Sequence, residues 1–124
     1  MDSEAPEPQS EIQIDLTPEF QQELRALSRR YRSIRSDIQG VIDALRAKNF
    51  VGDRLSGVGD GYVTFKVRVR NSDIQKGKSA GYRLIYQVES PTSVLLLTIY
   101  SKSDRNDIGA NEIRRMLNEF YGDE

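Results

Sequence analysis

Three strand-like segments in the second half of the chain constrain the fold most strongly. Residues 62–70, 81–89 and 93–100 are rich in β-branched and aromatic side chains, and turn-forming stretches separate them. Such a pattern is typical of an antiparallel meander. Residues 94–97 are apolar on both faces, so we expect them to lie in the buried central strand of the sheet.

The first third of the chain predicts a strand followed by a helical hairpin. Residues 11–16 alternate polar and apolar side chains, as a half-buried strand does. Residues 17–31 and 33–45 each carry an apolar stripe at helical spacing, with Thr17 and Ser33 as suitable N-caps.

The end of the chain predicts a third helix. Apolar residues at helical spacing begin near Asn106 or Asp107 and end before Gly122. The expected fold class is therefore α+β, with the order β-α-α-β-β-β-α. We expect a small antiparallel-dominated sheet, a helical hairpin packed on one face and a C-terminal helix. Residues 53–55 are a candidate for an additional short strand.

The length of 124 residues fits a single domain. Residues 1–10 hold two prolines and three acids and are expected to be a disordered acidic leader, which leaves residues 11–121 as the domain. The chain contains neither the arrangement of a secretory signal nor an apolar run of membrane-spanning length. A cytoplasmic protein without membrane contact is expected.

The absence of cysteine and histidine limits the chemistry. It excludes disulfides, thiolate or imidazole metal sites and Ser-His triads. A general base would have to be a carboxylate, a lysine or a tyrosine. We therefore expect no metal and no cofactor.

Charge is distributed unevenly along the chain. The 18 basic and 19 acidic residues nearly balance, but eight of the acids lie in residues 1–17 and 119–124. Between residues 18 and 118, 18 bases face 11 acids, a net charge of +7. The body of the protein is therefore basic, as in a protein that binds a polyanion.

Cations alternate with apolar residues on the predicted strands. Phe65, Val67 and Val69 fall on one face of the first strand and Lys66, Arg68 and Arg70 on the other. Arg83 interrupts an otherwise apolar strand, and Lys102 and Arg105 follow the last one. Repulsion among these cations costs stability unless a bound anion compensates, so we expect a phosphate-binding face with Lys66 and Arg83 exposed. The simpler interpretation, a solvated sheet face, also fits the first strand.

Such a cluster could cleave RNA without histidine. Arginine can stabilise charge on the phosphate through bidentate contacts. Lys66 could transfer a proton near neutral pH only if crowding by Arg68 and Arg83 destabilised its ammonium form. A site with so few catalytic groups would need another body to position its substrate.

The cationic segments carry a resemblance to a known family. Residues 65–70 (FKVRVR), 77–87 (GKSAGYRLIYQ) and 99–105 (IYSKSDR), in this order of elements, resemble the RelE/ParE superfamily of bacterial type II toxins, over about Ile12 to Leu117. The chain is most similar to the RelE and HigB branches. Members of those branches are ribosome-dependent endoribonucleases that cleave mRNA in the A site and are silenced by a cognate antitoxin.

The resemblance implies roles for individual residues. It implies a metal-independent mRNA interferase, which inhibits translation and has the antitoxin, the ribosome and mRNA as partners. The implied catalytic residues are Lys66, Arg68, Arg83, Lys102 and Arg105. Implied RNA-binding residues are Arg70, Lys76, Lys78 and Tyr82, although Tyr82 also suits a buried position in the sheet.

The sequence departs from the RelE pattern, and two other functions stay open. Gly109 stands where RelE has a catalytic tyrosine, Ser103 replaces a basic residue, and the loop at residues 71–80 is longer. One alternative is a ParE-like toxin, which inhibits DNA gyrase by binding it and hydrolyses nothing. The other is a catalytically degenerate module that only binds an antitoxin.

Overall fold

The computed structural model of the chain describes residues 12–74 and 80–122. The expected order of elements is confirmed, with the additional two-residue strand β2. The elements are β1 (Gln13–Leu16), α1 (Pro18–Arg30), α2 (Ile34–Arg46), β2 (Asp53–Arg54), β3 (Thr64–Val69), β4 (Tyr82–Ser90), β5 (Ser93–Ser101) and α3 (Ala110–Tyr121). The expected acidic leader and the expected RNA-binding residues Lys76 and Lys78 lie outside the described residues.

The five strands form one mixed sheet in the order β1-β5-β4-β3-β2. β1 runs parallel to β5, and the other neighbours are antiparallel, so the expected meander of β3, β4 and β5 is confirmed. One detail was wrong: the central strand is β4, because β1 lies outside β5. Residues 94–97 of β5 are nevertheless fully buried, since helices cover both faces at that point.

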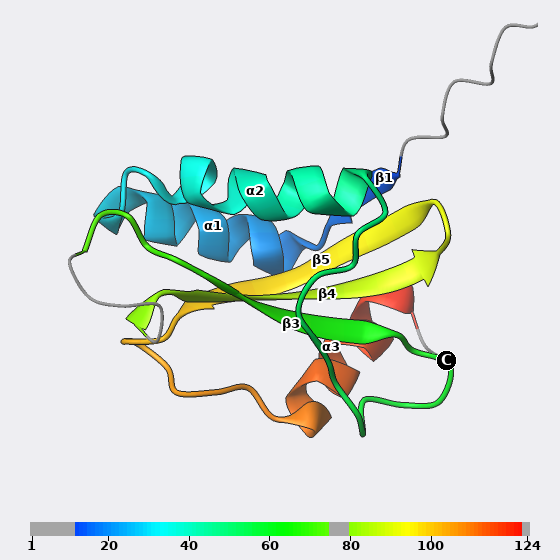
Figure 1. The fold of residues 1–124 in the computed structure, drawn as a ribbon. Helices are drawn as coiled ribbons and strands as arrows, with labels where there is room; N and C mark the ends of the chain where they lie inside the picture. Colours follow the sequence, from blue (N-terminus) through cyan, green and yellow to red (C-terminus); the bar gives the residue numbers. More distant parts are fainter. Residues whose placement is uncertain (1–11, 75–79, 123–124) are drawn as a thin grey trace, which may run out of the picture.

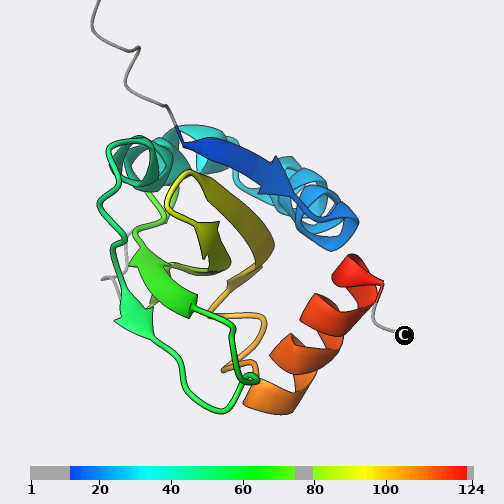
Figure 2. The ribbon, with the colours of Figure 1, turned by 90° about the vertical axis from the view of Figure 1, so that its right-hand side faces the viewer.

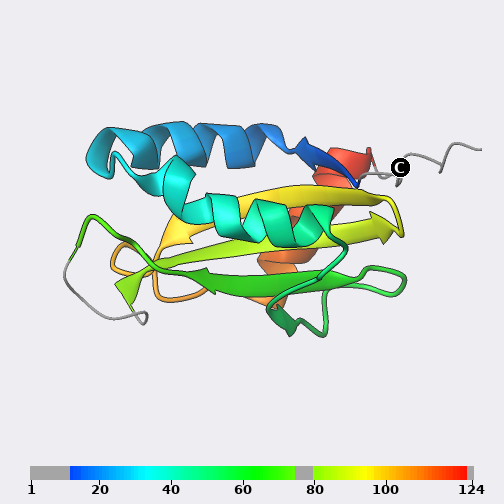
Figure 3. The same ribbon diagram turned by 45° about the horizontal axis from the view of Figure 1, so that its top comes forward.

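The sheet lies between two helical layers (Figures 1 and 2). α1 and α2 form the predicted hairpin on one face, with α1 over β5 and α2 toward β3 (Figure 3). α3 lies on the opposite face. Alternation along β4 divides the core accordingly, because Leu84 and Tyr86 pack under the hairpin whereas Ile85 packs against α3.

Thr17 fastens the start of α1 to the sheet. Its hydroxyl oxygen accepts a hydrogen bond from the backbone N–H of Phe20 at 2.9 Å, which confirms the predicted N-cap. The same hydroxyl donates to the carbonyl oxygen of Leu97 at 2.7 Å. Leu97 is the residue left over where the β4–β5 register shifts, so its carbonyl group is available to Thr17.

The other two helices begin differently from the prediction. Ser33 precedes α2, but its side chain does not cap the helix and instead donates to Asp73 at 3.0 Å. α3 begins after Gly109, two residues beyond Asp107, and ends at Gly122 in the left-handed conformation, as expected. No helix in the described part of the chain is long and apolar enough to cross a membrane.

Gly81 explains why a glycine precedes the Tyr-Arg pair of β4. A Cβ atom at this position would lie 2.1 Å from the carbonyl oxygen of Val69. The end of β3 and the start of β4 therefore approach each other more closely than any side chain permits. The Gly81 carbonyl oxygen also accepts a hydrogen bond from the backbone N–H of Lys102 at 2.8 Å.

Candidate functional site

The sheet brings three of the predicted catalytic residues to the same face. Arg68 of β3 pairs with Arg83 of β4, and Lys66 pairs with Ile85. Ile85 packs under α3, so Lys66, Arg68 and Arg83 all belong to the α3 side of the sheet. The predicted alternation of cations and apolar residues along β3 is thus confirmed for residues 65–69.

The connection between β5 and α3 supplies a carboxylate to this face. Asp107 Oδ1 accepts hydrogen bonds from Lys66 Nζ at 3.1 Å, from the Tyr100 hydroxyl at 3.4 Å and from the Ile108 backbone N–H at 2.8 Å. The Lys66 ammonium is the main reason that the pKa of Asp107 is lowered. Burial, followed by the charge of Asp107, raises the pKa of Tyr100.

Two further cations near this site are also paired within the chain. The Arg105 guanidinium binds Glu112, and its Nε donates to the carbonyl oxygen of Asp107 at 3.0 Å. Arg30 binds Asp104 at 2.5 Å. We expected that a bound anion would compensate the cations of the sheet, but carboxylates of the residue 104–112 segment already pair with two of them, Lys66 and Arg105.

Exposure of the predicted residues also differs from the expectation. Arg83 is only 5% exposed, and its Nη1 donates to the carbonyl oxygen of Tyr82 at 3.1 Å. The side chain of Lys66 is 27% exposed. The expected exposure of Arg83 was therefore wrong, whereas Arg68 and Arg70 are exposed, the latter just beyond the end of β3. Lys102 is half-buried beside the start of β4.

Tyr82 lies on the other side of the sheet. It is fully buried beneath the helical hairpin, where its ring meets Tyr31 edge to face with centroids 5.9 Å apart. Burial raises the pKa of its hydroxyl. The ring is therefore not accessible to a nucleotide base, which corrects the expectation that Tyr82 binds RNA.

Gly109 lies at the surface, at the N-cap of α3. A Cβ atom built there meets no other atom within 4 Å, and its φ of −80° suits any residue. The missing tyrosine is thus not excluded by packing. The described residues contain no group of three or more acidic side chains that could hold a metal ion.

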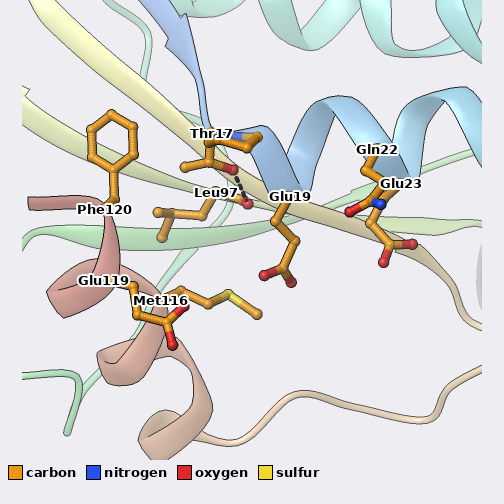
Figure 4. A pocket seen from close by; sticks show the side chains of 9 residues that line it. Thr17, Glu19, Gln22, Glu23, Leu97, Met116, Glu119 and Phe120 are labelled. Atoms are coloured by element: carbon orange, nitrogen blue, oxygen red, sulfur yellow. Dashed lines mark hydrogen bonds between the residues drawn. The ribbon is translucent and has the colours of Figure 1, made fainter.

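Sequence reasoning missed a groove between α1 and α3, which encloses about 620 Å³ (Figure 4). Its apolar lining includes Leu97, Met116 and Phe120, and its acidic lining includes Glu19, Glu23 and Glu119. Burial raises the pKa of Glu19. The arrangement can accept a basic segment with an apolar anchor. Its sequence signal was weak, because Glu19 and Glu119 lie 100 residues apart.

Comparison with known proteins identifies a family. The family model described as the ParE toxin of the type II toxin-antitoxin system parDE matches residues 14–106, about three-quarters of the chain. The match runs from β1 to the residues that follow β5 and includes all the predicted catalytic positions. No curated protein and no solved structure matches the chain.

Proposed function

We propose that this chain, which belongs to the ParE toxin family of type II toxin-antitoxin systems, inhibits DNA gyrase by binding it and does not cleave RNA. The family implies a cognate antitoxin as a partner. The order of our two leading hypotheses is thereby reversed, since the sequence alone favoured an mRNA interferase of the RelE or HigB kind.

The ion pair between Lys66 and Asp107 is the observation that supports this proposal most strongly. A lysine that transfers protons near neutral pH needs surroundings that destabilise its ammonium form. Lys66 instead donates to a carboxylate 3.1 Å away. The side chain of Asp107 is 60% exposed, so its negative charge also repels a phosphate that approaches Lys66.

The remaining geometry is consistent with action through protein contacts. Phe120 and Tyr121 are the two large apolar side chains that are well exposed among the described residues, and Phe120 lines the acidic groove. Aromatic side chains of this kind are common anchors of protein interfaces.

Purified protein can be tested against both targets in parallel. We expect it to inhibit DNA supercoiling by gyrase in proportion to its concentration, and to leave mRNA on translating ribosomes intact. Cleavage of ribosome-bound mRNA without any effect on gyrase would overturn the proposal. Heat-unfolded protein serves as the control in both assays.

A ribosome-dependent endoribonuclease is the second candidate, and one observation favours it. Lys66, Arg68 and Arg83 share one face of the sheet, next to the segment with Lys102 and Arg105. A phosphate could contact such a face if Asp107 moved away. Under this alternative, these five cations carry the activity, and cleavage of mRNA in the A site is lost in Lys66→Ala and Arg68→Ala.

A further inference from the structure

The turn of the helical hairpin carries a dense group of arginines that neither function explains. Five arginines occur within residues 25–35, and no acidic residue lies between Glu23 and Asp37. All five are exposed in the structure. We call this segment, from the end of α1 to the start of α2, the arginine elbow. Its members are Arg25, Arg29, Arg30, Arg32 and Arg35.

Carboxylates of the described residues leave most of the elbow unpaired. Arg30 binds Asp104 and lies over the Tyr31 ring at 4.9 Å. The other four arginines form no salt bridge with any described residue. Two acids near the turn contact backbone groups: Asp37 accepts from the Ser72 backbone N–H at 3.0 Å, and Asp73 accepts from the Ser33 N–H at 2.8 Å.

Some positions of these arginines are unfavourable to the fold, although Arg29 and Arg30 lie in the last turn of α1, where the helix dipole favours a cation. Arg25 and Arg29 lie one turn apart on α1, where like charges repel each other. Arg35 lies in the first turn of α2, where the helix dipole disfavours a cation. An anionic ligand would relieve both effects.

The contacts of Asp37 and Asp73 extend the basic surface beyond the elbow. They fasten residues 72 and 73 to the start of α2, so the segment that follows β3 lies at the same end of the molecule as the elbow (Figure 1), and this segment begins with the exposed Arg70. The Arg30–Asp104 pair brings the segment after β5 to this end as well. Cations from several elements therefore lie at this end of the molecule.

We propose that the arginine elbow binds the phosphate backbone of a duplex nucleic acid. Arginine forks contact phosphate oxygens in a bidentate manner, and backbone binding requires several such contacts without an apolar centre. The elbow contains no well-exposed large apolar side chain, whereas large aromatic side chains are common anchors of protein interfaces. The large exposed apolar side chains of the described chain lie instead on α3, at the other layer of the fold.

The binding is independent of sequence and sensitive to salt. The elbow presents side chains on a convex helical turn, with no element that could enter a groove and read base edges. Phosphate neutralisation releases counterions, so affinity falls steeply as salt rises. This inference goes beyond the proposed function and does not depend on whether gyrase is the target.

The test compares two double variants with the same change of charge. Arg29→Gln with Arg32→Gln removes two elbow charges, and Arg46→Gln with Lys48→Gln removes two exposed charges at the other end of α2. Fluorescence anisotropy measures binding to labelled 20-base-pair DNA and RNA duplexes over a salt series. Thermal unfolding checks that both variants fold.

We expect the elbow variant to bind duplex roughly tenfold or more weakly at 0.1 M salt, with a salt slope shallower by about 1.8. The control variant should stay within about twofold of the wild type. Binding of either duplex supports the proposal, and their relative affinity identifies the natural one. Equal losses in the two variants, or no duplex binding by the wild type, would overturn it. Tighter binding of polyglutamate than of both duplexes would also overturn it, in favour of an acidic protein partner.

Discussion

The cations of the sheet and those of the arginine elbow differ in their surroundings. Lys66 and Arg105 contact carboxylates, and Arg83 is buried. Four elbow arginines are exposed and form no salt bridge within the described residues. Both groups stand out in the sequence as positive charge, but carboxylates pair with Lys66 and Arg105 of the first group, whereas four arginines of the second pair with no described carboxylate. Local charge density therefore does not identify a binding surface until the carboxylates around it are known.

Replacement of the buried arginine should have the largest effect. We expect Arg83→Ala to lower the free energy of unfolding by about 2–3 kcal/mol, because it leaves a cavity within the sheet. Arg32→Ala, its control in the elbow, should change it by less than about 0.5 kcal/mol. Urea denaturation measures both. Equal stabilities of the two variants would contradict the contrast between a buried and an exposed cation.

Removal of the Asp107 carboxylate should leave Lys66 without its ion pair, as most arginines of the elbow are. We expect Asp107→Asn to lower the free energy of unfolding by about 0.5–1 kcal/mol, since the pair with Lys66 is partly exposed. Lys66 then becomes available to phosphate, and the salt slope of duplex RNA binding should steepen by about 0.9. Glu112→Gln serves as a comparison, because it releases Arg105 instead. An unchanged slope in both variants would show that these carboxylates do not screen the face.

Acid should weaken the same pair. Lys66 holds the pKa of Asp107 below its ordinary value, so the Asp107 carboxylate binds a proton less readily in the folded state than in the unfolded chain. The stabilisation is present above about pH 4 and is lost as the pH falls through the folded pKa. Melting temperatures between pH 6 and 3 should therefore fall more in the wild type than in Asp107→Asn. Identical pH profiles would contradict the lowered pKa.

Restoration of the missing tyrosine should have little effect. Gly109→Tyr meets open space but replaces a favourable N-cap residue, so the free energy of unfolding should fall by no more than about 1 kcal/mol. We expect no cleavage of ribosome-bound mRNA by this variant, because Asp107 still holds Lys66. The double variant Gly109→Tyr with Asp107→Asn shows whether the missing tyrosine or the Lys66–Asp107 pair prevents cleavage. Cleavage by Gly109→Tyr alone would show that the site lacked nothing but the tyrosine.

Most of the fold could be predicted because its signals are local. The spacing of Phe20, Leu24 and Leu27 defines α1, and the alternation from residue 65 to 69 defines β3 and its two faces. The Thr17 N-cap and the end of α3 at Gly122 were predictable for the same reason. The side-chain contact of Ser33 was not predictable, because its hydroxyl binds Asp73, forty residues later, and does not cap α2.

The candidate site was predictable only in part, because its electrostatics depend on distant residues. Strand alternation placed Lys66 and Arg68 on one face correctly. The contact between Lys66 and Asp107 spans 41 residues, and no local pattern indicates it. Arg83 looked exposed because it is charged, yet β3 and β5 enclose it on both sides. The elbow was visible in the sequence, but only the positions of Asp37 and Asp73 show that its arginines remain available.

Lys66→Ala tests the central claim most directly, that the toxin acts without cleaving RNA. The variant is expressed in a bacterial host, and growth, DNA damage response and ribosome-bound mRNA are measured beside the wild type, with circular dichroism to confirm folding. We predict growth arrest and DNA damage equal to those of the wild type, with intact mRNA in both. Relief of the arrest by Lys66→Ala in a folded protein, together with mRNA cleavage by the wild type, would contradict this account.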